Sequence, residues 1–205
     1  MKKVFSSVCI AFSFVQMVFA QGGVYQFTPV YQTKAGETED QCQSGTCWSF
    51  ATISFLEAEI IRKGNKSVDL SEMFNVYYTY QKKADSYVRY QGKQQFGPGG
   101  LSHDVIRVVR EFGLVPESAY TGLLLNEVQH NHDGLDNVLE SLVSTVLKKG
   151  LNSHDQNWRK SVIGILDANL GAAPKQFTYE GKSYTPTTFR DEMKINADDY
   201  VSITS

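Results

Sequence analysis

Cys47 opens the strongest helical pattern in this chain of 205 residues. Apolar side chains follow it at spacings of one, three or four, and Gly64 with Asn65 supplies a stop signal. A cysteine in the first turn of a helix lies beside unpaired backbone N–H groups and the positive end of the helix dipole. Both effects favour the thiolate, which is the nucleophilic form. We therefore expect a helix that presents Cys47 as a reactive thiol.

The residues just before Cys47 supply further parts of an acyl-transfer site. Gly45 allows close approach of a substrate to the backbone, and Gln41 can project a side-chain amide beside the nucleophile. An oxyanion formed at a scissile carbonyl would meet that amide and the backbone N–H of Cys47. The competing interpretation is a cysteine that serves only as a small buried hydrophobe. The coincidence of three roles within seven residues favours chemistry.

Three motifs in the same order resemble the papain-type cysteine peptidases. They are Gln-x-x-Ser-Gly-x-Cys-Trp-x-Phe-Ala at 41–51, Asp-Leu-Ser-Glu at 69–72 and Gly-Pro-Gly-Gly at 97–100. The resemblance implies that Cys47 is the nucleophile and Gln41 the oxyanion residue. It also implies that Gly99 and Gly100 contact the substrate backbone in β fashion.

Within that family, the chain is similar to the bleomycin hydrolase and aminopeptidase C branch. Ser44 stands where classical papains carry a disulfide cysteine, and residues 179–189 and the Asp-Asp-Tyr-Val at 198–201 also fit the branch. The resemblance covers 24–205 and is strongest over 41–120. It implies an α+β, papain-like fold, represented mostly by the helical, nucleophile-bearing half plus a helical insertion, with the β-rich half largely missing. It also makes an oligomer possible.

A thiol peptidase needs a base, which the resembled family supplies as a histidine followed by an asparagine. The four histidines are His103, His130, His132 and His154, and their polar flanks predict solvated surface positions. The His130 and His132 pair could bind a metal, but two ligands without a third do not make a site, so no metal or cofactor is expected. We expect the catalytic histidine and asparagine beyond Ser205.

The remaining elements follow from periodicity and capping residues. A helix after Asp69 has a capping box formed with Glu72, and another helix is capped by Ser102. Further helices are expected over 135–149, 158–169 and 187–193, and Thr185-Pro186 starts the last of them. An extended hairpin is expected over 175–185, with its turn at Glu180-Gly181. Short strands are expected at 24–27 and 200–205.

The N-terminus has the pattern of a cleaved secretory signal over residues 1–20, followed by a peptidase domain over 21–205. Lys2 and Lys3 precede 17 uncharged residues, and Val18-Phe19-Ala20 forms a cleavage site. The alternative is a membrane anchor, for which this run is short. Cleavage removes Cys9 and takes the formal net charge from −2 to −4. An exported protein, periplasmic or secreted, without stable membrane insertion is expected.

Charge and cysteine content exclude several function classes. A near-neutral balance gives no support for nucleic-acid binding. Cys42 and Cys47 are too close for an unstrained bridge, and their spacing is not that of a redox pair. We therefore expect an exported thiol peptidase acting on peptide substrates through a Cys47 acyl-enzyme. The alternative is a catalytically inactive relative that binds peptides or regulates.

Overall fold

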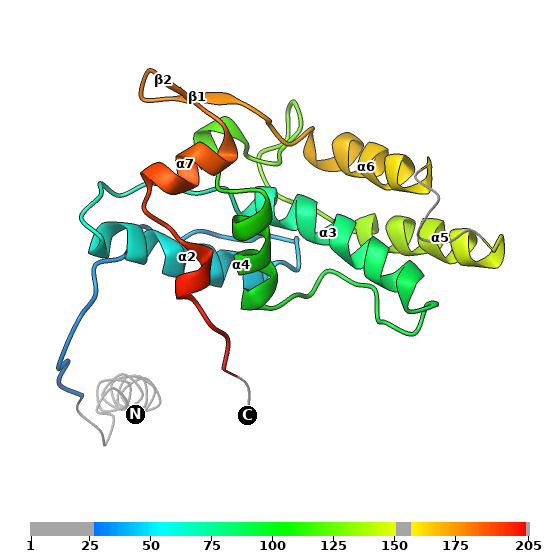
Figure 1. The fold of residues 1–205 in the computed structure, drawn as a ribbon, viewed down its shortest axis with the longest axis horizontal. Helices are drawn as coiled ribbons and strands as arrows, with labels where there is room; N and C mark the ends of the chain where they lie inside the picture. The colour runs from blue at the N-terminus through cyan, green and yellow to red at the C-terminus, as the bar shows by residue number, and fades with distance from the viewer. Residues whose placement is uncertain (1–26, 151–156, 204–205) are drawn as a thin grey trace, which may run out of the picture. The chain divides into compact units, whose positions relative to one another are not determined.

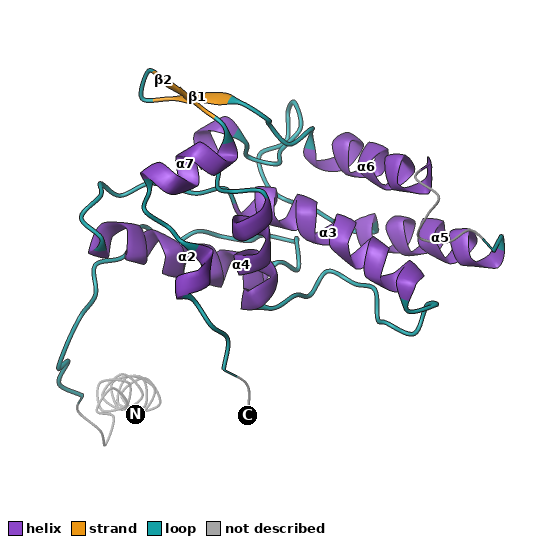
Figure 2. Ribbon diagram, viewed as in Figure 1, coloured by secondary structure: helices purple, strands orange, loops and turns teal. Residues whose placement is uncertain are grey.

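A computed structural model describes residues 27–150 and 157–203. Of these, residues 33–150 and 157–203 belong to one compact unit (Figures 1 and 2), and residues 27–32 belong to a separate one. The helices of the larger unit are α2 (Cys47–Arg62), α3 (Glu72–Arg89), α4 (Ser102–Glu111), α5 (Leu135–Lys148), α6 (Asn157–Leu170) and α7 (Pro186–Glu192). Two 3-10 turns lie at Glu117–Ala119 and Ala197–Asp199, and the strands are β1 (Phe177–Tyr179) and β2 (Lys182–Tyr184).

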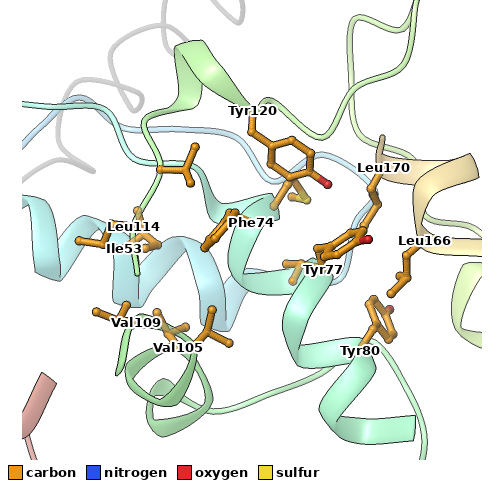
Figure 3. Packing of buried hydrophobic residues seen from close by; sticks show 14 of the residues in the cluster. Ile53, Phe74, Tyr77, Tyr80, Val105, Val109, Leu114, Tyr120, Leu166 and Leu170 are labelled. Carbon is orange, nitrogen blue, oxygen red and sulfur yellow. The ribbon is translucent and has the colours of Figure 1, made fainter. Parts of the chain in front are cut away.

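Helix α3 is the centre of the unit, since it contacts α2, α4, α5 and α6. Its side chains are buried on nearly every face of its first half, and Phe74, Tyr77 and Tyr80 lie between the other helices (Figure 3). Ile53 of α2 and Val105 of α4 are fully buried on one side of it. Burial of large apolar side chains is the main stabilising term in such a cluster.

The helical insertion expected from the sequence is the pair α5 and α6, which pack on each other and on α3 (Figure 1). Leu139, Val143 and Leu166 are almost fully buried there. A polar tie joins α3 to α6, because the Tyr77 hydroxyl donates to Asp167 Oδ1 at 2.6 Å. The insertion is therefore part of the same core as the nucleophile-bearing helix.

The expected hairpin and the helix after it are confirmed. Strands β1 and β2 pair antiparallel, with Phe177 opposite Tyr184, and the turn residues Glu180 and Gly181 have φ of 47° and 79°. The Thr185 hydroxyl accepts a hydrogen bond from the Thr188 N–H at 3.2 Å, and Pro186 is the first residue of α7. The helix-rich unit with one small sheet agrees with the expected fold class.

Three local predictions are wrong. Helix α3 is capped by Ser71, whose hydroxyl accepts from the Phe74 N–H at 3.2 Å, and not by Asp69. Helix α4 starts after Leu101, whose N–H donates to Asp104 Oδ2 at 3.0 Å, so Ser102 is already helical. Residues 200–203 form no strand, because no second strand lies beside them in the described part of the chain.

Some predictions fall on residues outside the described ranges. They are the signal over 1–20, most of the strand at 24–27, and His154. Among the residues that the structure describes, no helix has the length and apolar character needed to cross a bilayer.

Candidate active site

Cys47 is the first residue of α2, and its side chain is exposed, as the sequence predicts. Two buried neighbours fix the start of this helix in place. The Trp48 indole N–H donates to the Pro98 carbonyl at 3.0 Å, and the Ser49 hydroxyl donates to the Glu72 carbonyl at 3.0 Å. The first turn contains no acidic residue that would offset the positive end of the helix dipole. The arrangement therefore presents a free thiol at a rigid helix start.

The loop that enters α2 is held by short-range hydrogen bonds. The Cys42 N–H donates to Asp40 Oδ1 at 2.8 Å, and the buried hydroxyls of Ser44 and Thr46 lie 2.5 Å apart. Gly45 has φ of 67°, and a Cβ there would lie 3.0 Å from Pro98 Cβ, so both conformation and space favour glycine. Cys42 and Cys47 are both free thiols.

Gln41, the expected oxyanion residue, lies at the start of this loop. Its side chain is partly buried, and its Oε1 atom is buried without a hydrogen-bond partner. The structure thus places Gln41 six residues before Cys47, in the loop that enters α2.

The glycine-rich loop packs against the residue that follows Cys47. A Cβ added to Gly100 would lie 2.7 Å from two ring atoms of Trp48, whereas one added to Gly99 would meet nothing within 4 Å. Gly100 is therefore packed onto the start of α2, and Gly99 faces open space. The structure thus brings the Gly97–Gly100 loop and the nucleophile-bearing helix start together, as the motif order predicts.

The prediction that all four histidines are solvated on the surface is wrong for His132, which is 9 % exposed, and for the half-buried His130. The segment pairs with the nucleophile loop, since the Gln43 N–H donates to the His130 carbonyl at 3.0 Å and the His132 N–H donates to the Gln43 carbonyl at 3.1 Å. Burial lowers the pKa of His132 to about 4, with His130 adding to the effect, so its ring is neutral near pH 7.

His103, by contrast, is exposed as predicted and lies 3.8 Å from Asp104. No described residue forms a hydrogen bond with the Cys47 thiol.

A family model described as papain family cysteine protease matches residues 25–134, which is more than half of the chain. The matched segment holds the Cys47 loop, α2, α3 and the glycine-rich loop described above.

The chain belongs to the papain family of cysteine proteases.

Two further comparisons agree with this assignment. Aminopeptidase G of Lactobacillus delbrueckii subsp. lactis is 24 % identical over 224 aligned positions, which cover 88 % of this chain and 50 % of that protein. The crystal structure of PepW from Lactobacillus rhamnosis HN001 has a TM-score of 0.59 at 18 % identity, covering 84 % of this chain and 47 % of that one. The chain therefore spans about half the length of the relatives it matches, and these relatives fit the resemblance drawn from the motifs.

A second cluster of ionisable groups lies beside α2 in this papain-family chain, behind the nucleophile. Glu37, Glu39, Glu57 and Glu72 line a cavity of about 260 Å³. Burial raises the pKa of Glu57 to about 7, and burial together with the neighbouring carboxylates raises the pKa of Glu39 and of Glu72. Oxygens of Glu39, Glu57 and Asp69 lie within 4.8 Å of one another, an arrangement that could accept a cation.

These raised pKa values predict that Glu57→Gln stabilises the protein at alkaline pH. A carboxyl whose pKa is about 7 when folded and 4.5 when free stabilises the fold fully below pH 4.5 and loses that contribution as the pH rises through 7. Glutamine keeps an acceptor for the Leu70 N–H, which lies 2.8 Å from Glu57 Oε1, and carries no charge. In EDTA, the variant should match the wild type at pH 4 and exceed it by on the order of 1–3 kcal/mol at pH 8.5.

Chemical denaturation at the two pH values measures this difference. Glu59→Gln on the same helix is the matched control, because Arg62 bonds that carboxylate and lowers its pKa. The control should gain no stability at pH 8.5. A Glu57→Gln variant that is no more stable than the wild type at pH 8.5 would show that Glu57 is ionised without penalty.

Proposed function

We propose that the chain carries the nucleophile-bearing part of an exported thiol peptidase that hydrolyses peptide bonds through a Cys47 acyl-enzyme. The observation that carries this proposal is the exposed Cys47 at the first position of α2, inside the segment that matches the papain family. Gln41 and the Cys47 backbone N–H would stabilise the oxyanion, and Gly99 and Gly100 would pair with the substrate backbone.

The reaction divides into two acyl transfers. The Cys47 thiolate adds to the scissile carbonyl carbon, and the resulting oxyanion is bound by the two N–H donors. Collapse of this intermediate breaks the C–N bond, and the amine leaves with a proton from the general acid. Water then attacks the thioester, which releases the carboxylic acid and restores the thiol. Each step reuses the same oxyanion site.

The base that accepts the thiol proton and later protonates the amine is proposed to be a histidine, oriented by an asparagine, from sequence after Ser205. Support comes from the half-length coverage of the relatives and from the burial of His132, which keeps its ring neutral and closed to solvent. The 205-residue stretch alone should therefore react slowly with a peptidyl epoxide, whereas the protein from its complete reading frame should react quickly. Equal rates would contradict a base outside this stretch.

The function is tested by labelling the protein from its complete reading frame with a thiol-directed peptidyl epoxide. The labelling rate should exceed that of a free thiol such as glutathione by at least about 10³-fold, because the peptide is bound and the thiol activated.

Peptides with free and acetylated N-termini, tested for turnover, separate aminopeptidase from endopeptidase action. Labelling at the rate of glutathione would favour the alternative, an inactive relative that binds peptides or regulates. That alternative is supported by the Cys47 thiol, which has no hydrogen-bond partner among the described residues.

Export is proposed from the signal pattern over residues 1–20. Mass spectrometry of the protein purified from its native host should give an N-terminus at Gln21, in the soluble exported fraction. An intact N-terminus at Met1 in the membrane fraction would instead support an uncleaved anchor.

A further inference from the structure

Lys83 is a half-buried lysine of α3 whose ammonium group lies against the glycine-rich loop. Its ammonium group donates to the Gly97 carbonyl at 2.7 Å and also to the Gly99 carbonyl. It also lies 5.7 Å from the centre of the Trp48 ring and 5.2 Å from that of Tyr80, within range of cation–π attraction. Lysine is rarely buried without such compensation.

The contacts of Lys83 and Trp48 together account for three consecutive carbonyls of the loop. Gly97 and Gly99 accept from Lys83, and Pro98 accepts from the Trp48 indole at 3.0 Å. The loop itself has no helix or strand, so these side chains replace the backbone partners that regular structure would provide. Because Trp48 directly follows Cys47, the loop is bonded at once to α3 and to the start of the nucleophile-bearing helix.

Lys83 also lines a cavity of about 470 Å³ with the loop residues 97–101. Burial lowers its pKa to about 8, opposed by the attraction of Asp104 on α4 and Asp136 on α5. Lys82 and Arg107 line the same cavity, but Lys82 is paired with Glu111 and Arg107 with Asp104, at 3.3 Å. Lys83 is thus the cavity cation that is bonded to the glycine-rich loop.

We propose that Lys83 is a positioning residue of the substrate-binding wall, which fixes the Gly97–Gly100 loop in the shape that lets Gly99 and Gly100 bind the substrate backbone. The inference rests on the proposed peptidase function. Lys83 does not touch the reacting atoms. Its two charge-assisted hydrogen bonds orient the loop, and loss of them leaves the Gly97 and Gly99 carbonyls to water or to other loop conformations.

The test compares Lys83→Met with Lys82→Met in the protein from its complete reading frame. Methionine keeps the length and apolar character of the lysine stem but has no donor. Lys83→Met should raise KM for a peptide substrate about tenfold and leave kcat within about twofold, because ground-state binding is lost and the chemistry is retained. Alkylation of Cys47 by iodoacetamide, which needs no peptide recognition, should be unchanged. Lys82→Met, on the same helix but bonded to Glu111, should leave KM unchanged.

A second readout uses the wild type alone, in case Lys83→Met does not fold. The ratio of the peptidyl-epoxide rate to the rate with a matched non-peptide epoxide cancels ionisation of the thiol and of the general acid, and it should fall severalfold between pH 7 and pH 9.5 as Lys83 loses its charge. A flat ratio, or an unchanged KM in a folded Lys83→Met, would overturn the inference. If the wild type labels no faster with the peptide reagent than with a matched non-peptide epoxide, the proposed function fails instead.

Discussion

Replacing Cys47 with alanine is expected to remove peptide hydrolysis, with a fall in kcat of at least about 10⁴-fold, because the thiol that forms the proposed acyl-enzyme is lost. The side chain is exposed at the first position of α2, so its loss leaves no cavity in the core. The thermal midpoint should therefore stay close to that of the wild type. Hydrolysis of a fluorogenic peptide amide measures the activity.

Cys42→Ala is the matched control for this experiment. Cys42 is the other free cysteine among the described residues, five positions away in the same loop. Its thiol donates to the Asp40 carbonyl at 3.5 Å and carries no assigned role in catalysis. The control should retain activity within about threefold. Activity that survives in Cys47→Ala but disappears in Cys42→Ala would show that Cys42, and not Cys47, is the nucleophile.

Gln41→Ala should lower kcat by about 10²–10³-fold with little change in KM, which is the range for removal of one oxyanion donor. The donor acts mainly on the charge that develops after the thiolate adds, so binding of the uncharged substrate depends on it much less. Alkylation of Cys47 by iodoacetamide forms no oxyanion and should be unaffected. The split between these two reactions separates an oxyanion role from a general loss of structure.

Gln43→Ala is the control for Gln41. Gln43 is an exposed glutamine in the same loop, and its bonds to the 130–132 segment are made by the backbone, which alanine retains. Its activity should be close to wild type. A Gln41→Ala variant with kcat within threefold of the wild type would remove Gln41 from the oxyanion site, and equal losses in hydrolysis and alkylation would assign it a structural role.

Local sequence signals predicted the nucleophile-bearing helix and the hairpin well. The spacing of apolar residues after Cys47 placed α2, and Glu180-Gly181 placed the turn, because both depend on residues close together in the chain. The cap of α3 was misplaced by two residues. Asp69 and Ser71 are both good capping residues, and the choice depends on tertiary hydrogen bonds, such as the one from the Ser71 N–H to the Val115 carbonyl.

Contacts between distant parts of the chain could not be predicted from local sequence patterns. His132 has polar neighbours and is nevertheless buried, because Asn131 pairs with Gln43, almost 90 positions earlier. The sequence signal for Lys83 is weak. It lies near Ala84 and Tyr80 on the buried face of a helix, but lysines at the edge of such a face commonly reach solvent. Its carbonyl partners, Gly97 and Gly99, lie 14 and 16 positions later in the chain, and the fold brings them to α3.

Trapping the acyl-enzyme would identify directly the residue that carries the acyl group. The protein from its complete reading frame is mixed with a peptide ester, quenched in acid and digested, and the modified peptide is sequenced by mass spectrometry. We expect an acyl group on the peptide that contains Cys47, formed in the wild type and absent from Cys47→Ala. Rapid turnover of the ester with no acyl group at Cys47, under conditions where deacylation is rate-limiting, would contradict it.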